Sequence, residues 1–122
     1  MTKPLLPLFA STCLLLAVTS TAQAEGLYAA IAISPSTGIA GTATNFETET
    51  LAETEAYQQC GSEDCDTALI FQQCGAIAVG QGHGWGAASD LSSATAIDNA
   101  LDICSENDSG CEITAAFCNE GY

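Results

Sequence analysis

Ala29-Ala-Ile-Ala-Ile33 is the stretch that decides the fold, because nearly the same residues return 46 positions later as Gly75-Ala-Ile-Ala-Val79. Each stretch carries β-branched residues and is followed by turn residues, so each predicts a β-strand. A pattern that returns at a fixed distance indicates a repeated structural unit. The sequence therefore predicts a domain made of two copies of one unit.

The register of the repeat continues beyond these two strands. Gly38-Ile-Ala40 falls on Gly84-Trp-Gly86 at the same shift of 46. Two residues are then missing from the second copy before its helix, so the helical positions match at a shift of 44. The segment from Cys104 to Cys111 is two residues longer than the segment from Cys60 to Cys65, so the shift then returns to 46. The positions that match in this way are Ala52 with Ala96, Ala56 with Ala100, Cys60 with Cys104, and Phe71 with Phe117.

Each copy is expected to form a strand, a turn, a strand, a helix and a third strand. In the first copy Pro35-Ser-Thr-Gly38 predicts the turn, because Pro fixes φ and Gly is free to take a positive φ. The helix begins near Thr48, by alignment with Ser92, or near Thr50, which forms a capping-box pattern with Glu53. The predicted strands cover 28–34, 39–44, 67–73, 75–80, 85–89 and 112–118; the first helix should end at Gly61 and the second should cover 92–104.

The fold class that follows is α+β. Two ββαβ-like repeats, at about 27–73 and 74–118, are expected to form a mainly antiparallel sheet with both helices packed on one face. The helices each have one apolar side that can cover such a face. The residues on these sides are Ala52, Ala56 and Cys60 in the first helix and Ala96, Ile97, Ala100, Leu101 and Cys104 in the second.

Residues 1–24 have the three parts of a signal peptide. A positively charged start precedes an apolar run from Leu5 to Val18, and small residues at Ala22 and Ala24 predict cleavage before Glu25. The apolar run is shorter than the roughly 20 residues that a membrane-spanning helix needs. The sequence therefore predicts an exported domain, residues 25–122, that is periplasmic or secreted and is not inserted in the membrane.

Six of the seven cysteines lie after the predicted cleavage site, and an even count in a short exported chain indicates three disulfides. Equivalent cysteines of a repeat should be bonded equivalently, so each helix-to-strand loop should be closed by a local bond. The two cysteines left over are expected to link the two halves. The predicted pairs are Cys60 with Cys65, Cys104 with Cys111, and Cys74 with Cys118. A zinc site is the alternative, but the chain has no Cys-x-x-Cys pair and a single histidine, so no metal is expected.

The charge of the chain is one-sided. All 15 acidic residues lie at or after Glu25, and the one basic side chain is Lys3, inside the predicted signal peptide. A domain without Lys or Arg cannot neutralise phosphates, which argues against nucleic acid and anionic lipid as partners. The acidic surface serves solubility or recognises a basic partner protein; composition leaves both open.

Three stretches resemble the DUF4189 family of small exported bacterial proteins. They are Gly75-Ala-Ile-Ala-Val-Gly80, the turn exit Gly84-Trp-Gly-Ala, and the run Ala-Ile-Ala-Ile-Ser-Pro-Ser-Thr-Gly that ends at Gly38. The resemblance spans nearly the whole predicted mature chain. It implies the fold and export, and it implies no activity. This sequence departs from the commoner Arg-rich members because it has no basic residue after Lys3.

The glycine-rich stretch Gly80 to Gly86 invites comparison with a phosphate-binding loop, because successive glycines let backbone amides approach an anion. It lacks the Lys and Ser/Thr of a P-loop and falls where the repeat requires a turn, so a turn is predicted. His83 lies in this stretch and is considered as a general base. No acidic residue is placed beside it by sequence spacing, so an exposed histidine is predicted instead.

Two acidic clusters could offer oxygens to calcium: Glu63-Asp64 with Asp66, and Glu106 with Asp108. Neither has the spacing of an EF-hand loop, so solvated loops are predicted, while calcium binding stays open. A pair of carboxylates for glycoside hydrolysis is equally open, because sequence cannot place two of them at the required separation. No catalytic, cofactor-binding or metal-binding residue is therefore assigned.

The leading hypothesis from sequence is a non-enzymatic exported module that binds an unknown partner protein, without a cofactor. The first alternative is an inhibitor or immunity-like protein that uses its acidic face against a basic enzyme. The second alternative is a small secreted hydrolase, which would require a pocket around His83 with a converging carboxylate.

Overall fold

A computed structural model describes residues 26–122. The predicted signal peptide, 1–24, lies outside the described residues. The first unit contains β1 (Tyr28–Ile33), β2 (Ala40–Phe46), α2 (Glu49–Cys60) and β3 (Asp66–Phe71). The second contains β4 (Cys74–Val79), β5 (Trp85–Asp90), α3 (Ser93–Asn107) and β6 (Glu112–Cys118). The α+β class and the order ββαβ in both units are those predicted from the repeat.

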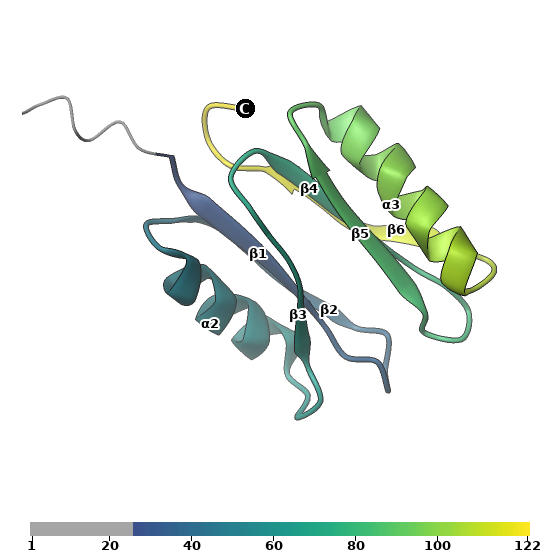
Figure 1. Cartoon of the computed structure of the whole chain (residues 1–122). Coiled ribbons are helices and arrows are strands. Elements are labelled where there is room, and N and C mark those ends of the chain that lie inside the picture. Colours follow the sequence, from purple (N-terminus) through teal and green to yellow (C-terminus); the bar gives the residue numbers. More distant parts are fainter. Residues whose placement is uncertain (1–25) are drawn as a thin grey trace, which may run out of the picture.

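The arrangement of the strands differs from the expected single sheet. Each unit forms its own three-stranded antiparallel sheet, with the orders β2-β1-β3 and β5-β4-β6. The two sheets pack face to face, and α2 and α3 cover the two opposite outer faces instead of one common face (Figure 1). The molecule is therefore built of four layers in the order helix, sheet, sheet, helix.

The central strands explain why two sheets form. In β1, Ala30 and Ala32 pack toward α2, while Ile31 and Ile33 pack in the cluster between the sheets. All four side chains are buried. A strand that is buried on both faces shows a continuous apolar run instead of alternation with polar residues, and both faces then need a cover. One helix covers one face, and the other sheet covers the second.

The layer between the sheets holds the large apolar side chains. Phe71 and Phe117 contact each other there, with ring centroids 5.3 Å apart. Trp85 lies half-buried at the rim of this layer. The helix-facing layers, in contrast, are lined mostly by alanine and cysteine. The buried members are Ala30, Ala32, Ala43, Ala52, Ala56 and Cys60 on one side and Ala76, Ala78, Ala96, Ala100 and Cys104 on the other.

One glycine in each unit lets the helix approach the sheet closely. A Cβ on Gly41 of β2 would lie 2.2 Å from the Ala56 carbonyl oxygen, and a Cβ on Gly86 of β5 would lie 2.3 Å from the Cys104 amide nitrogen. Gly41 pairs with Ala32 and Gly86 with Ala78, so the two glycines occupy the same place in their units.

The strand pairing corrects the sequence alignment by one residue. Ala40 pairs with Ile33 and Trp85 pairs with Val79, so Ala40 corresponds to Trp85 and not to Gly86. One of the two residues missing from the second unit is therefore lost in the turn. The other is lost at a β-bulge near the end of β2, around Asn45, whose φ is 66°.

The helix termini follow the expected capping chemistry. Thr48, and not Thr50, is the N-cap of α2, because its hydroxyl accepts a hydrogen bond from the Leu51 amide at 3.2 Å. Ser92 caps α3 in the same way through the Thr95 amide. Gly61 ends α2 with a φ of 74°, as predicted. The second helix continues to Asn107, three residues beyond its predicted end at 104.

The three disulfides join the predicted pairs, Cys60 with Cys65, Cys104 with Cys111 and Cys74 with Cys118. The Cys74–Cys118 bond, however, does not link the two units. Cys74 begins β4 and lies directly opposite Cys118 of β6, with their Cα atoms 3.9 Å apart, so the bond staples two neighbouring strands of the second sheet. The expectation failed because Cys74 belongs to the first strand of the second unit and not to the end of the first.

Asn119 makes the polar connection between the units. Its side-chain NH₂ donates to the Phe71 and Gln72 carbonyls, and its Oδ1 accepts from the Asn45 amide. The Thr44 hydroxyl also donates to Oδ1. Asn119 is buried and fully paired, so it fixes the chain after β6 onto the bulged end of β2.

Candidate functional site

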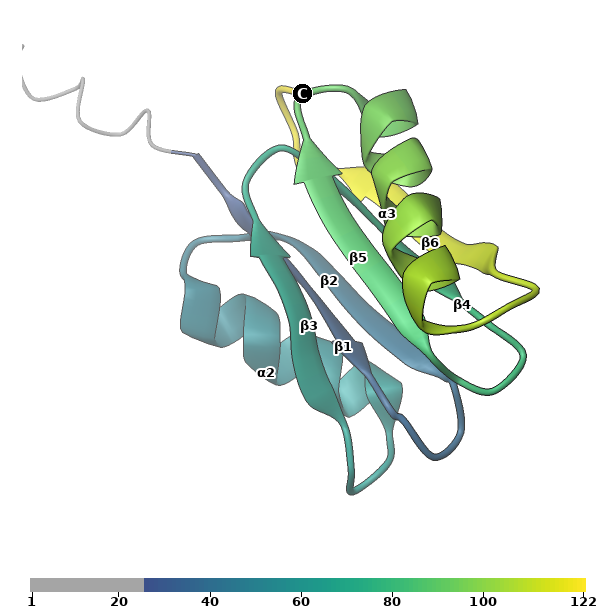
Figure 2. The same ribbon diagram turned by 45° about the vertical axis from the view of Figure 1, so that its right-hand side comes forward.

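The two hairpin turns lie side by side at one end of the molecule (Figure 2). The β1–β2 turn and the β4–β5 turn meet where the His83 ring lies against Gly38, since a Cβ on Gly38 would be 2.9 Å from His83 Cδ2. Both residues have positive φ values, 75° for Gly38 and 70° for His83. A non-glycine residue in this region is uncommon, although His tolerates it better than most residues. We call this part of the molecule the turn end.

Asp108 holds the glycine-rich turn through hydrogen bonds to backbone amides. Its Oδ2 accepts hydrogen bonds from the Gly82 and Gly84 amides, each at 2.8 Å, and its Oδ1 accepts one from the Ser109 amide at 2.7 Å. A Cβ on Gly80 would lie 2.6 Å from the Asp108 side chain, so only glycine allows this approach. The backbone amides do form an anion-binding arrangement, and the anion that they bind is a carboxylate of the same chain.

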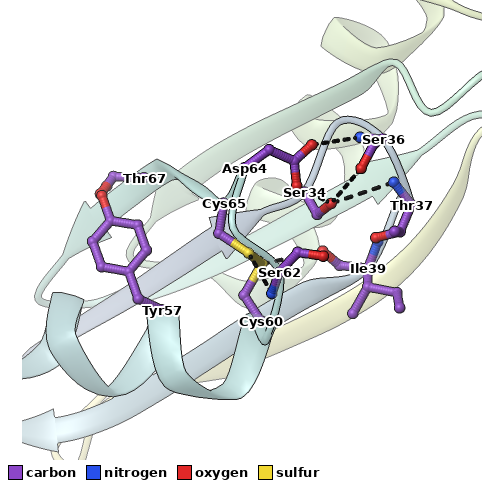
Figure 3. The surroundings of a disulfide bond; sticks show 10 residues. All are labelled: Ser34, Ser36, Thr37, Ile39, Tyr57, Cys60, Ser62, Asp64, Cys65 and Thr67. Carbon is purple, nitrogen blue, oxygen red and sulfur yellow. Dashed lines mark hydrogen bonds between the residues drawn. A yellow bond between two sulfur atoms is a disulfide. The ribbon is translucent and has the colours of Figure 1, made fainter.

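Asp64 holds the other turn in a similar way (Figure 3). Its Oδ1 accepts from the Ser34 hydroxyl at 2.7 Å, and its Oδ2 accepts from the Ser36 amide at 3.0 Å. Ser34 is buried, and its Oγ also accepts from the Thr37 amide. The carboxylate therefore satisfies a buried hydroxyl and fixes the conformation of the turn.

The two aspartates are equivalent positions of the repeat. They lie 44 residues apart, which is the shift that also relates Cys60 to Cys104. Each aspartate lies in the loop that a local disulfide closes, between Cys60 and Cys65 or between Cys104 and Cys111. We call these two side chains the turn clamps.

Hydrogen bonding sets the acidity of both clamps. The Ser34 hydroxyl, followed by Ser36, holds the pKa of Asp64 below its ordinary value. The Ser109 amide, followed by the Gly84 and Gly82 amides, lowers the pKa of Asp108, and the nearby His83 contributes in the same direction. Donors directed at a carboxylate favour its charged form, so both clamps are ionised at neutral pH.

The clamps change two expectations from sequence. The acidic loops were expected to be merely solvated, yet Asp64 and Asp108 form hydrogen bonds across the turn end. The glycine-rich stretch is a turn, as predicted, and two of its amides are already bound to Asp108. Sequence reasoning missed both clamps, although the common shift of 44 was the signal that could have found them.

His83 does have a carboxylate nearby, which sequence spacing did not place. Asp108 lies close enough to His83 for the histidine to contribute to the lowered pKa of its carboxyl. Both oxygens of that carboxylate, however, accept hydrogen bonds from backbone amides. Across residues 26–122, no three His, Cys, Asp or Glu side chains are grouped to hold a metal ion.

The remaining acidic side chains lie on the outside of the helices. On α3, Asp98, Asp102 and Glu106 follow one another at intervals of four residues and are exposed. On α2, two of the carboxylates have side-chain partners, since Glu53 accepts from the Thr67 hydroxyl and Glu55 accepts from the Gln59 amide. Among the described helices, none is long and apolar enough to cross a membrane.

Comparison with known proteins places the chain in a family. Residues 28–118 match the family described as "Domain of unknown function (DUF4189)". The chain belongs to the DUF4189 family. The match covers both ββαβ units, from the first residue of β1 to the last residue of β6, so the duplicated sandwich with its turn clamps is the DUF4189 domain in this chain.

A solved structure has a similar fold. The protein Rv1813c from Mycobacterium tuberculosis, known from an NMR structure, is 25% identical in sequence and superposes with a TM-score of 0.59. The similarity covers 93% of this chain and 97% of that chain. No curated protein matches the sequence. The comparisons thus supply a family and a fold for this DUF4189 domain, and its function has to be proposed from its own residues.

Proposed function

We propose that this DUF4189 domain is a non-enzymatic binding module that acts outside the cytoplasm and recognises a basic partner protein through the outer surface of its second unit. The observation that carries the proposal is the row of exposed carboxylates at Asp98, Asp102 and Glu106 on α3. The chain has no Lys or Arg after Lys3 to balance them. A surface of one sign steers an oppositely charged partner and rejects partners of like charge.

The turn end supports a scaffold role in preference to chemistry. Asp64 and Asp108 contact the two turns, and both carboxylates are engaged by donors of the same chain. Two local disulfides close the loops that carry these aspartates, and a third staples β4 to β6. A rigid, cross-linked support with charged groups on its outside suits recognition of another protein, because little conformational entropy remains to be lost on binding.

The proposal is tested by capture from a native envelope fraction on immobilised mature protein, at low and at high salt. We expect a basic protein to be retained at low salt and released at high salt, because exposed charges are screened within about 10 Å at moderate ionic strength. Capture that does not respond to salt contradicts the proposal. Loss of a hydrolytic activity from the captured protein on binding would favour the inhibitor alternative.

A matched pair of variants locates the surface. The triple variant Asp98→Asn, Asp102→Asn and Glu106→Gln removes three charges from α3 and should abolish most of the capture. The control removes three charges from α2 and should retain more of it, because two of those carboxylates are already engaged on the protein. The control substitutions are Glu49→Gln, Glu53→Gln and Glu55→Gln. Equal loss in both variants would show that total charge, and not the α3 surface, recruits the partner.

Export is tested separately by the intact mass of the protein from the envelope fraction. Cleavage before Glu25 predicts a chain of residues 25–122 with three disulfides. A mass that retains Met1 would contradict export by a cleaved signal peptide, and with it the location that this function requires.

A further inference from the structure

The free edge of β5 differs from the edges of the other outer strands. The pairings of β2, β3 and β6 with their central strands each contain a register shift, whereas β5 pairs with β4 over six consecutive positions without one. Bulges distort an edge and protect it from pairing with another chain. Among the edge strands of the described residues, β5 alone therefore presents a regular template.

The register shows which backbone groups of β5 are free. The Gly80 amide donates to the Gly84 carbonyl, which makes this pair a hydrogen-bonded one. Hydrogen-bonded and non-bonded pairs alternate along an antiparallel ladder. Trp85, Ala87 and Ser89 therefore direct their N–H and C=O groups away from β4. The Asn107 side chain agrees with this assignment, because its Nδ2 donates to the outward-facing Trp85 carbonyl.

The surface beside this edge is apolar and acidic. Ile103 lies one helical turn before Asn107 on α3 and is 39% exposed. Glu106 adjoins Asn107, and Asp102 lies a further turn back; both are exposed. Before its last residue, Asp90, β5 itself has no charged side chain. The edge thus offers main-chain hydrogen bonds, and the neighbouring helix α3 carries one exposed apolar side chain and two exposed carboxylates.

We propose that the β5 edge binds an extended, positively charged segment of the partner protein by β-strand addition. The proposal rests on the basic partner proposed above and names how that partner docks. Main-chain pairing supplies affinity in this mode, and side chains on alternate positions supply specificity. Lysine or arginine on the added strand would lie near Asp102 and Glu106. A second copy of this chain is a poorer occupant, because its formal charge of −14 repels an identical charge.

The test uses an alternating Lys-Val octapeptide as the probe and Ser89→Pro as the variant. Proline at this position removes an outward N–H and no hydrogen bond to β4, since Ser89 lies opposite Gly75 in a non-bonded pair. Its side chain is exposed, so the ring adds no volume to the core. We expect affinity for the peptide to fall about tenfold or more, the equivalent of about 1.4 kcal/mol. Ser89→Ala keeps the N–H and should bind like the wild type.

A second variant guards against misfolding of the proline variant. Ser89→Lys keeps the backbone groups and places a positive charge at the edge, so it should also weaken binding of the Lys-Val peptide, and a Glu-Val peptide should not bind the wild type. Equal binding of the Lys-Val peptide by the wild type, Ser89→Pro and Ser89→Lys overturns the edge proposal and leaves the basic partner standing. Peptide binding that salt does not weaken contradicts both the basic partner and the charged segment proposed for the β5 edge. A dimer in analytical ultracentrifugation that Ser89→Pro abolishes overturns the basic segment as the occupant.

Discussion

The two units share one architecture and differ at the edge strand that follows their first turn. In the first unit, β2 carries a bulge, and Asn119 covers its end through the Asn45 amide and the Thr44 hydroxyl. In the second unit, β5 is regular. Within the described residues, the Asn107 side chain is the one hydrogen-bond partner of its outward-facing N–H and C=O groups. The duplicated interior is thus kept in both units, while only one of the two equivalent edges is left open.

The two units also differ in the cross-links that stabilise them. Both have a local disulfide, a close helix-to-sheet approach at a glycine, and an aspartate that clamps the turn. The second unit alone has a disulfide between its central strand and an outer strand, Cys74–Cys118. The corresponding positions in the first unit are Tyr28 and Gln72, which lie next to the paired residues Ala29 and Phe71. The open unit is therefore also the more strongly cross-linked one.

Removal of the strand disulfide should have the largest effect on stability. Cys74 and Cys118 are 44 residues apart, whereas the local pair Cys60–Cys65 is 5 apart. In the chain-entropy model the longer loop contributes about 4 kcal/mol and the shorter about 2 kcal/mol. Chemical denaturation of Cys74→Ala/Cys118→Ala beside Cys60→Ala/Cys65→Ala measures the difference. Equal losses would show that the extra bond does not distinguish the second unit.

A Cβ at the close helix contacts should be nearly as damaging in either unit. Gly41→Ala and Gly86→Ala each force a methyl group into backbone atoms less than 2.5 Å away, so the helix must move. We expect each to cost about 3 kcal/mol in the free energy of unfolding. Thr114→Ala on the exposed side of β6 serves as the control and should change it by less than about 0.5 kcal/mol. Tolerance at one glycine alone would mean that the two units do not pack alike.

Neutralising the turn clamps should destabilise the second unit more than the first. Asp108 accepts three backbone amides, whereas Asp64 accepts one amide and one hydroxyl. Asp108→Asn should therefore lower the melting temperature more than Asp64→Asn does at neutral pH. Asp102→Asn, on the outer face of α3, provides the control for charge alone. The reverse order for the two clamps would refute the ranking by number of donors.

The smallest effect is the dependence of the clamps on pH. Both carboxyls have a pKa below the ordinary value of 3.8, so the unfolded chain takes up protons first as the pH falls. Their stabilisation is present above the unfolded pKa and is lost as the pH falls through the folded pKa. The melting temperature of the wild type should thus converge with that of Asp64→Asn/Asp108→Asn as the pH falls below about 4. A constant difference across this range would contradict the lowered pKa values.

The sequence predicted the elements from local patterns, and it predicted the repeat and the cysteine pairs from the spacing of equivalent residues in the two copies. It did not predict two separate sheets, since Ala30 and Ile31 are both apolar and only packing shows which face each one covers. The turn clamps were missed for a related reason. Asp64 lies 28 residues from the Ser36 amide that it binds, and Asp108 lies 24 residues from the Gly84 amide, so neither contact leaves a local pattern. The difference between the β2 and β5 edges depends on one extra residue in β2, and only the strand pairing locates that residue.

The asymmetry between the two edges is tested most directly by amide hydrogen exchange at single residues, measured with and without the alternating Lys-Val peptide. Ala87 of β5 and Thr42 of β2 are equivalent outward positions of the two units, opposite Ile77 and Ile31. We expect the peptide to slow exchange at Ala87 and Ser89 and to leave exchange at Thr42 unchanged. Equal slowing at Thr42 and Ala87, or binding that slows neither, would contradict the claim that the second unit alone offers an edge to a partner.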